Sequence, residues 1–114
     1  MKDGSTFEQL LAAKGVSLQA LGLKELALHR ADALLAAEQL REASAPILGG
    51  DVYFVRGSSV EQAFANWHSD RRPGEGWREF AERSYRETTR YLEAFPHRPE
   101  VSPVFVLVVA QGTE

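Results

Sequence analysis

The sequence contains no cysteine, and this absence excludes several kinds of site. Disulfide bridges, thiolate nucleophiles and cysteine-liganded metals all require a cysteine side chain. Histidine is scarce as well, because His29, His68 and His97 are the only three and lie far apart in the sequence. We therefore predict no metal site and no cofactor, and we expect an apolar core to hold the fold together.

Long hydrophobic runs are also missing. The longest, from Val104 to Ala110, is far shorter than the roughly 20 residues that a helix needs to cross a bilayer. The first residues, Met1 to Ser5, lack the basic and then apolar pattern of a signal peptide. We therefore expect no membrane partner and a cytoplasmic location.

The chain has no excess of positive charge. Thirteen lysines and arginines face sixteen acidic residues, which gives a formal net charge of -3 and argues against nucleic acid as a partner. Arginines do gather between residues 71 and 90, but glutamates alternate with them. Such a mixture is typical of a solvated, salt-bridged helix face.

The residues that are present predict one domain over residues 1–114 with three helices. Ser5 and Glu8 match a capping box at the start of a first helix that ends at Gly15. A second helix is expected from Leu23 to Glu42 and a third from Trp77 to Phe95, because apolar residues recur there at helical spacing. In the second helix we expect His29 to face water and a broad apolar face to form from Leu23, Leu26, Ala27, Ala31, Leu34 and Leu35.

Strands are predicted at Val52–Val55 and Val104–Val109, where β-branched and aromatic residues follow one another. Pro46 and the Gly49–Gly50 pair predict a sharp turn before the first of them. Residues 60–68 fit either a helix or the return arm of a hairpin, and periodicity does not decide between the two. The resulting order, α-α-β-β-α-β, predicts an α+β fold with a small antiparallel or mixed sheet of about three to four strands under packed helices.

We find no signature of catalysis. The sequence lacks the nucleophile elbow, the HExxH metal motif and the EF-hand spacing, and Gly49–Gly50 precedes a strand, whereas phosphate loops follow one. Ser69 stands between His68 and Asp70, but neighbouring residues of an extended chain point apart and cannot converge on one reacting atom. We therefore expect a protein that is not an enzyme.

Three residues have both a structural and a functional interpretation, and a fourth has a structural one. The Asp51 carboxylate could bind backbone amides of the Gly-Gly turn or pair with an arginine, or it could remain an exposed anion for a basic partner. Tyr53 could belong to the core or to a contact surface, whereas the large area of Trp67 favours the core. On the third helix, Ser84 should face inward and bond to a carbonyl one turn earlier.

Several of these residues also carry a family resemblance. The string Ile47–Tyr53, with Asn66–Trp67, Arg83–Ser84 and the closing apolar strand, resembles the bacterial immunity protein 40 family, which accompanies polymorphic toxins. The resemblance extends over residues 22–110, although Ala65 stands where the family carries an acidic or amide residue. It favours a strand at residues 60–68.

The resemblance implies a non-enzymatic protein that binds and neutralises a cognate toxin domain. It nominates as contact or motif residues Gly49, Gly50, Asp51, Tyr53, Asn66, Trp67 and Ser84. The alternative is a small-molecule-binding or regulatory domain with a cleft near Asp51, Tyr53 and Trp67.

Overall fold

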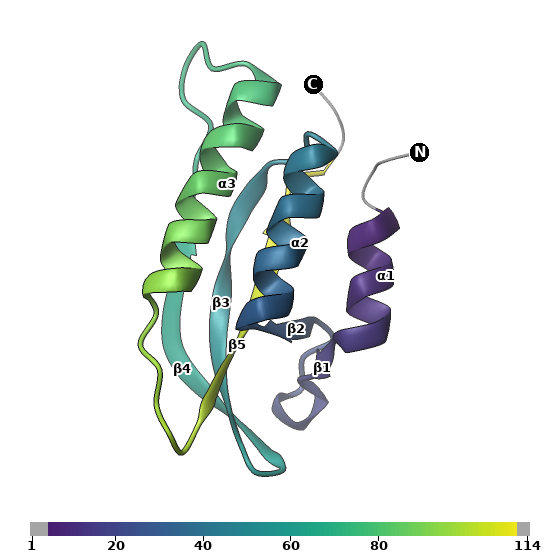
Figure 1. The fold of residues 1–114 in the computed structure, drawn as a ribbon, viewed down its shortest axis with the longest axis vertical. Helices are drawn as coiled ribbons and strands as arrows, with labels where there is room; N and C mark the ends of the chain where they lie inside the picture. Colours follow the sequence, from purple (N-terminus) through teal and green to yellow (C-terminus); the bar gives the residue numbers. More distant parts are fainter. Residues whose placement is uncertain (1–4, 112–114) are drawn as a thin grey trace.

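The protein is an α+β domain, as predicted, and its described part is residues 5–111 of a computed structural model (Figure 1). Three α-helices and five strands occupy that part of the chain. In chain order they are α1 (Ser5–Lys14), β1 (Val16–Ser17), the 3-10 helix η1 (Gln19–Leu21), β2 (Leu26–His29), α2 (Arg30–Glu42), β3 (Ile47–Arg56), β4 (Ser59–His68), α3 (Trp77–Ala94) and β5 (Ser102–Val109). The helix predicted near the N-terminus is confirmed as α1, while the predicted cap by the Ser5 side chain lies outside what is described.

The five strands form one antiparallel sheet in the order β1-β2-β5-β3-β4. β5 is central, because it pairs with β3 on one side and with β2 on the other. β3 and β4 form a hairpin, so residues 60–68 are strand and the helical alternative was wrong. The prediction that these three long segments share one sheet is confirmed.

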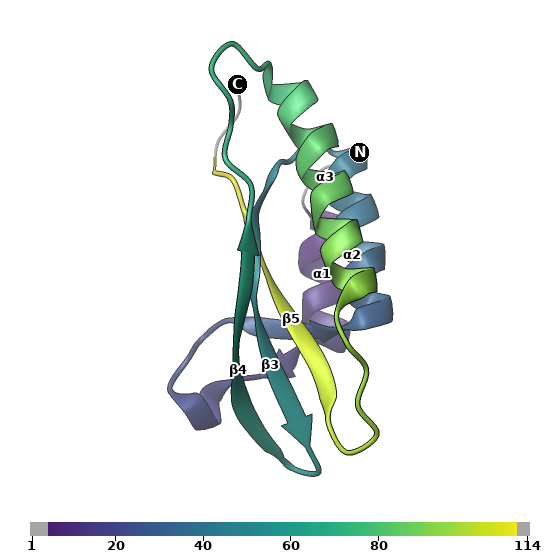
Figure 2. The same cartoon turned by 90° about the vertical axis from the view of Figure 1, so that its left-hand side faces the viewer.

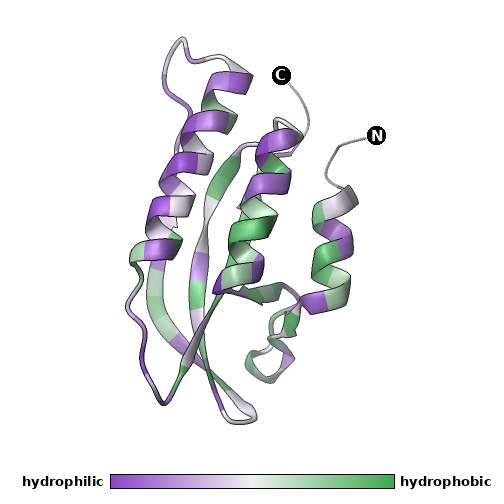
Figure 3. Ribbon diagram, viewed as in Figure 1, coloured by the Kyte–Doolittle hydropathy of each residue, from purple (hydrophilic) through white to green (hydrophobic). Residues whose placement is uncertain are grey.

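All three helices cover one face of the sheet (Figure 2). The main core lies between these two layers and includes Leu28, Val52, Phe105 and Leu107 from the strands and Leu40 and Leu92 from the helices. The predicted inward position of Ser84 on α3 is confirmed, and the other buried residues of this helix are Phe80, Ala81, Thr88 and Leu92. Hydrophilic residues fill much of the rest of this helix (Figure 3).

A second, smaller core lies on the outer face of the sheet, which we define as the face away from the helices. The connection from β1 to β2 crosses to this side (Figure 2), where Leu18 packs with Tyr53, Val104 and Val106. The β1–β2 connection covers the end of the outer face that carries Tyr53. The rest of the outer face is described with the site below.

The prediction of one helix over Leu23–Glu42 was wrong at its start. Leu26–His29 is a strand that pairs with β1 and β5, and α2 begins only at Arg30. Pairing with β5 satisfies backbone groups and buries Ala27 and Leu28 on opposite faces of the sheet, which outweighs the local helix propensity of leucine and alanine. The predicted exposure of His29 is confirmed.

The later start changes which side of α2 is buried. Its inward residues are Ala33, Ala36, Ala37 and Leu40, whereas Leu35, predicted to be inward, is 46% exposed. Small alanine side chains allow this helix to approach the sheet closely. Within residues 5–111, no helix has the length and apolar character needed to span a membrane.

The predicted turn at Gly49–Gly50 was also wrong. β3 already begins at Ile47, and both glycines lie inside the strand. Pro46 stands directly before it, is buried, and accepts a hydrogen bond from the Ala110 amide at 2.9 Å. The two glycines therefore do not form a turn, and the atoms close to them on the neighbouring strands explain why residues without a side chain are needed there.

Candidate functional site

Gly50 leaves the space that the Trp67 side chain fills. The two residues are direct partners across β3 and β4. A Cβ atom on residue 50 would lie 2.4 Å from Cη2 of Trp67 and 2.0 Å from the Val106 carbonyl oxygen. A strand glycine of this kind marks the close approach of another group, here an indole ring.

Several contacts with α3 fix the Trp67 ring in the core. Its Nε1–H donates to Oγ1 of Thr88 at 3.0 Å, and its ring stacks on Tyr91 with centroids 4.7 Å apart. Phe105 meets it edge-on at 6.4 Å. The residue is only 9% exposed, so the prediction that it belongs to the core is confirmed.

Gly49 has a different constraint. Its φ of +140° is a conformation that residues with a side chain rarely adopt, and a Cβ would lie 2.1 Å from the Trp67 carbonyl oxygen. The register with β5 shifts here, because Ile47 pairs with Val109 while Gly49 pairs with Val108. The shift leaves Leu48 between them without a partner on β5, and Leu48 is 38% exposed.

Ser84 joins α3 to the start of the same strand. Its hydroxyl donates to the Ala81 carbonyl at 3.1 Å, as predicted, and accepts from the Ile47 amide at 2.9 Å. The side chain is fully buried. Ser84 therefore satisfies a buried backbone N–H of β3 that would otherwise lack a partner.

Arg83, the residue before it, holds the loop that follows β4. Its guanidinium binds both carboxylate oxygens of Glu75 at 2.8 Å and one oxygen of Glu87 at 3.0 Å. The same guanidinium donates to the Asp70 carbonyl. The side chains of Arg83 and Glu75 are each 11% exposed, so the predicted solvated helix face is wrong here, whereas Arg86 is 59% exposed and fits it.

The network shifts the acidity of both carboxylates. Hydrogen bonds from the Arg83 side chain and the Arg72 amide lower the pKa of Glu75 from 4.5 to about 2. For Glu87, burial acts to raise the pKa, but hydrogen bonds from Ser69 and Arg83 and the nearby positive charges lower it overall. Both groups are therefore stabilised in their charged form.

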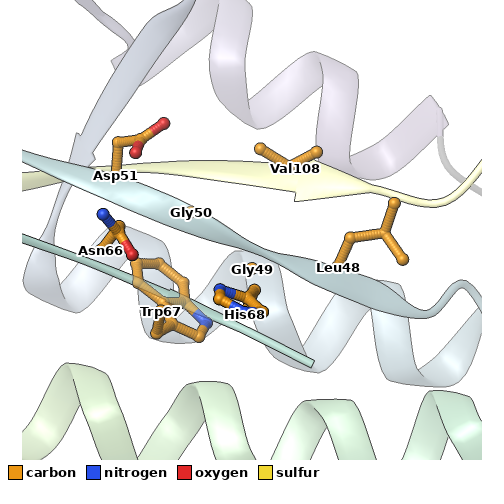
Figure 4. Close-up of a pocket in the computed structure, with 8 residues that line it drawn as sticks. All are labelled: Leu48, Gly49, Gly50, Asp51, Asn66, Trp67, His68 and Val108. Atoms are coloured by element: carbon orange, nitrogen blue, oxygen red, sulfur yellow. The ribbon is translucent and has the colours of Figure 1, made fainter. Parts of the chain in front are cut away.

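On the outer face, the glycine positions leave a shallow groove with a volume of about 230 Å³ (Figure 4). It runs over three strands and is lined by Leu48, Gly49, Gly50, Asp51, Asn66, Trp67, His68 and Val108. Asp51 and Asn66 are direct cross-strand partners, and both are exposed. Tyr53 does not line the groove.

Asp51 has neither of the partners that a structural role would give it. Within residues 5–111 its carboxylate accepts no hydrogen bond and forms no ion pair. Tyr53, two residues further along β3, is 7% exposed. Burial is the main reason that the pKa of Tyr53 is raised, and the negative charges of Asp51 and Glu25 raise it further. Asp51 is thus an exposed anion beside a buried tyrosine.

Sequence reasoning missed Phe64, which is 89% exposed. Val52 pairs with Ala65 while Tyr53 pairs with Gln62, so Ala63 and Phe64 form a bulge in β4 without partners on β3. The φ of Phe64 is +55°. Only the pairing of β4 with β3 reveals the exposure of this ring.

The described residues bring together no metal-binding group of three or more histidine and acidic side chains. The groove is also smaller than the roughly 300–1,000 Å³ of typical small-molecule pockets. Among its lining residues, only Asp51 and His68 have ionisable side chains. The arrangement offers an anion, hydrogen-bonding groups and apolar edges.

Comparison with known protein families gives a match. The model of a family described as immunity protein 40 matches residues 17–109, which include every strand-borne residue discussed above. Neither curated proteins nor solved structures provide a match to the chain.

Proposed function

The chain belongs to the immunity protein 40 family, and from this premise we propose that it binds a cognate toxin domain and neutralises it. The family match over residues 17–109 is the observation that carries the proposal. We propose that the protein acts in the cytoplasm of the cell that makes the toxin. Its partner is a protein, and it needs no cofactor.

We assign different parts to the nominated residues. Asp51 and Asn66 are exposed cross-strand partners, which supports direct contact with the toxin. Gly50, Trp67 and Ser84 lie in or against the core, which supports a scaffold role. Gly49 shapes the groove, and the buried Tyr53 supports the strand beneath Asp51.

Neutralisation in this proposal is by occupancy of the toxin surface, without chemistry in the immunity protein. The groove is too small for a typical ligand but lies on an exposed sheet face, which suits a protein partner better than a small molecule. A net charge of -3 would speed association with a basic toxin.

Co-expression provides the direct test. The toxin domain encoded beside this protein's gene should kill cells when it is expressed alone and spare them when this chain is present. In vitro, inhibition should rise in proportion to added protein and end at a fixed ratio near one to one. Death despite abundant soluble protein would exclude the immunity function, and complete inactivation by trace amounts would indicate an enzyme instead.

A further inference from the structure

We propose that the toxin docks on the uncovered end of the outer face, with the Phe64 ring as the apolar anchor and Asp51 as the charged contact. The inference rests on the proposed function and adds to it a surface and the chemistry of the partner. That partner presents an apolar cavity for an aromatic ring and, beside it, an arginine or lysine for the carboxylate.

Phe64 is unusual in two independent respects. At 89% exposed it far exceeds the other exposed large apolar residues, of which Leu35 is the next at 46%. Its φ of +55° is also an uncommon conformation for a bulky residue, and it disfavours the folded state. Within residues 5–111 no aromatic ring packs against it. Aromatic side chains, phenylalanine among them, are enriched at the cores of protein interfaces.

The surroundings of Phe64 complete a contact surface. Phe64 lies two residues before Asn66 on the same strand, a separation of at most about 7 Å along the chain. Asn66 faces Asp51, and beyond them Leu48 and Val108 are 38% and 42% exposed. Ala63 and Ala65, the two neighbours of Phe64, pack against the main core, so the exposed Phe64 ring lies on the other side of the strand, with Asn66. An apolar anchor is therefore close to a polar pair and an apolar border.

The charge of this surface indicates the charge of the partner's surface. Asp51 is the one formally charged residue among those that line the groove, and it has no ion pair within the described chain. Both of its oxygens remain available, and a guanidinium can bind two carboxylate oxygens at once. The complementary surface is therefore cationic at this point.

A second copy of this chain fits the surface less well. A symmetric contact whose two-fold axis passes near the groove would bring two Asp51 carboxylates toward each other, and like charges repel. Pairing through the free edge of β4 is hindered as well, because the bulge at Phe64 interrupts that edge. The observations therefore favour a different protein of opposite charge.

The test measures binding of an inactive form of the neighbouring toxin domain to four variants. Phe64→Gly removes the ring and accepts the positive φ, so the variant should keep its fold and melting temperature. Asp51→Asn removes the charge at constant shape. The matched controls are Leu35→Ala and Glu93→Gln, an exposed apolar and an exposed acidic residue on the helix layer.

We expect Phe64→Gly to raise Kd about 30-fold, chiefly through faster dissociation. Asp51→Asn should raise Kd about tenfold and reduce its dependence on salt, since a screened ion pair is lost. Both controls should bind like the wild type. Wild-type affinity in Phe64→Gly and Asp51→Asn would overturn this surface while leaving the immunity function intact.

Three further outcomes are decisive. If Leu35→Ala and Glu93→Gln bind more weakly than the wild type while Phe64→Gly and Asp51→Asn bind equally well, the interface lies on the helices and the proposal is overturned. No binding by the wild-type chain would overturn the proposed function and this inference together. A dimer of the chain that dissociates in Phe64→Gly would assign the ring to self-association instead.

Discussion

The two faces of the β3–β4 hairpin have opposite properties although their residues alternate along the same strands. Toward the helices, Gly50 and Trp67 fit together and Val52 is 1% exposed. Toward the outside, Asp51, Asn66 and His68 are exposed. Because successive strand residues point to opposite faces, one short motif carries both a packing unit and a surface.

The outer face itself is divided along β3. Its Tyr53 end is buried beneath Leu18 and the neighbouring apolar residues of the β1–β2 connection. Its Asp51 end forms the open groove. Stability and recognition are thus separated both across the sheet and along the strand, and this difference can be tested by substitution.

Trp67→Ala should have the largest effect on stability. The substitution removes a buried ring, its stack on Tyr91 and its hydrogen bond to Thr88, so we expect a loss of about 3–5 kcal/mol in the free energy of unfolding. The neighbouring exposed residue provides the control, because His68→Ala should change stability by less than about 0.5 kcal/mol. Urea denaturation of both variants measures the difference. Equal urea midpoints for Trp67→Ala and His68→Ala would contradict the difference in burial between the two faces of the hairpin.

Gly50→Ala should have the next largest effect. Its new methyl group would overlap the Val106 carbonyl oxygen and the Trp67 ring, and such overpacking costs about 1–3 kcal/mol. Gly76→Ala is the matched control, since its Cβ would come no closer than 3.4 Å to the nearest atom outside its chain neighbours. The melting temperature of Gly76→Ala should be well above that of Gly50→Ala. If both melt alike, the space above Gly50 is not needed.

Glu75→Gln tests the loop network that ends beside the groove, and its effect on stability should be present above pH 4.5 and disappear as the pH falls toward 2. Because the pKa of Glu75 is lowered to about 2 by Arg83 and the Arg72 amide, its contribution is present above pH 4.5 and is lost as the pH falls toward 2. Melting temperature should therefore fall less steeply over this range in Glu75→Gln than in the wild type. The control, Glu93→Gln, should retain the wild-type slope. Parallel slopes in all three proteins would argue against the network.

Sequence patterns identified the elements in which local and tertiary preferences agree. α3 has an apolar stripe along its length and polar residues around it, so its buried face could be predicted residue by residue. The run Val104–Val109 predicted a strand, which β5 confirms. The same patterns, with the family resemblance, also identified the hairpin motif and the inward position of Ser84 and Trp67.

The remaining features depend on contacts between distant segments. Leu26–His29 has the composition of a helix but forms β2, because pairing with β5 satisfies its backbone and buries both of its faces. Gly49 and Gly50 suggest a turn when read along the chain, yet a ring and two carbonyl oxygens from neighbouring strands require them. The exposure of Phe64 follows from a bulge that exists only when β4 pairs with β3. Local sequence determined where the chain favours helix or strand, whereas the tertiary structure decided which residues face outward, because strand register is set by partners far away in the sequence.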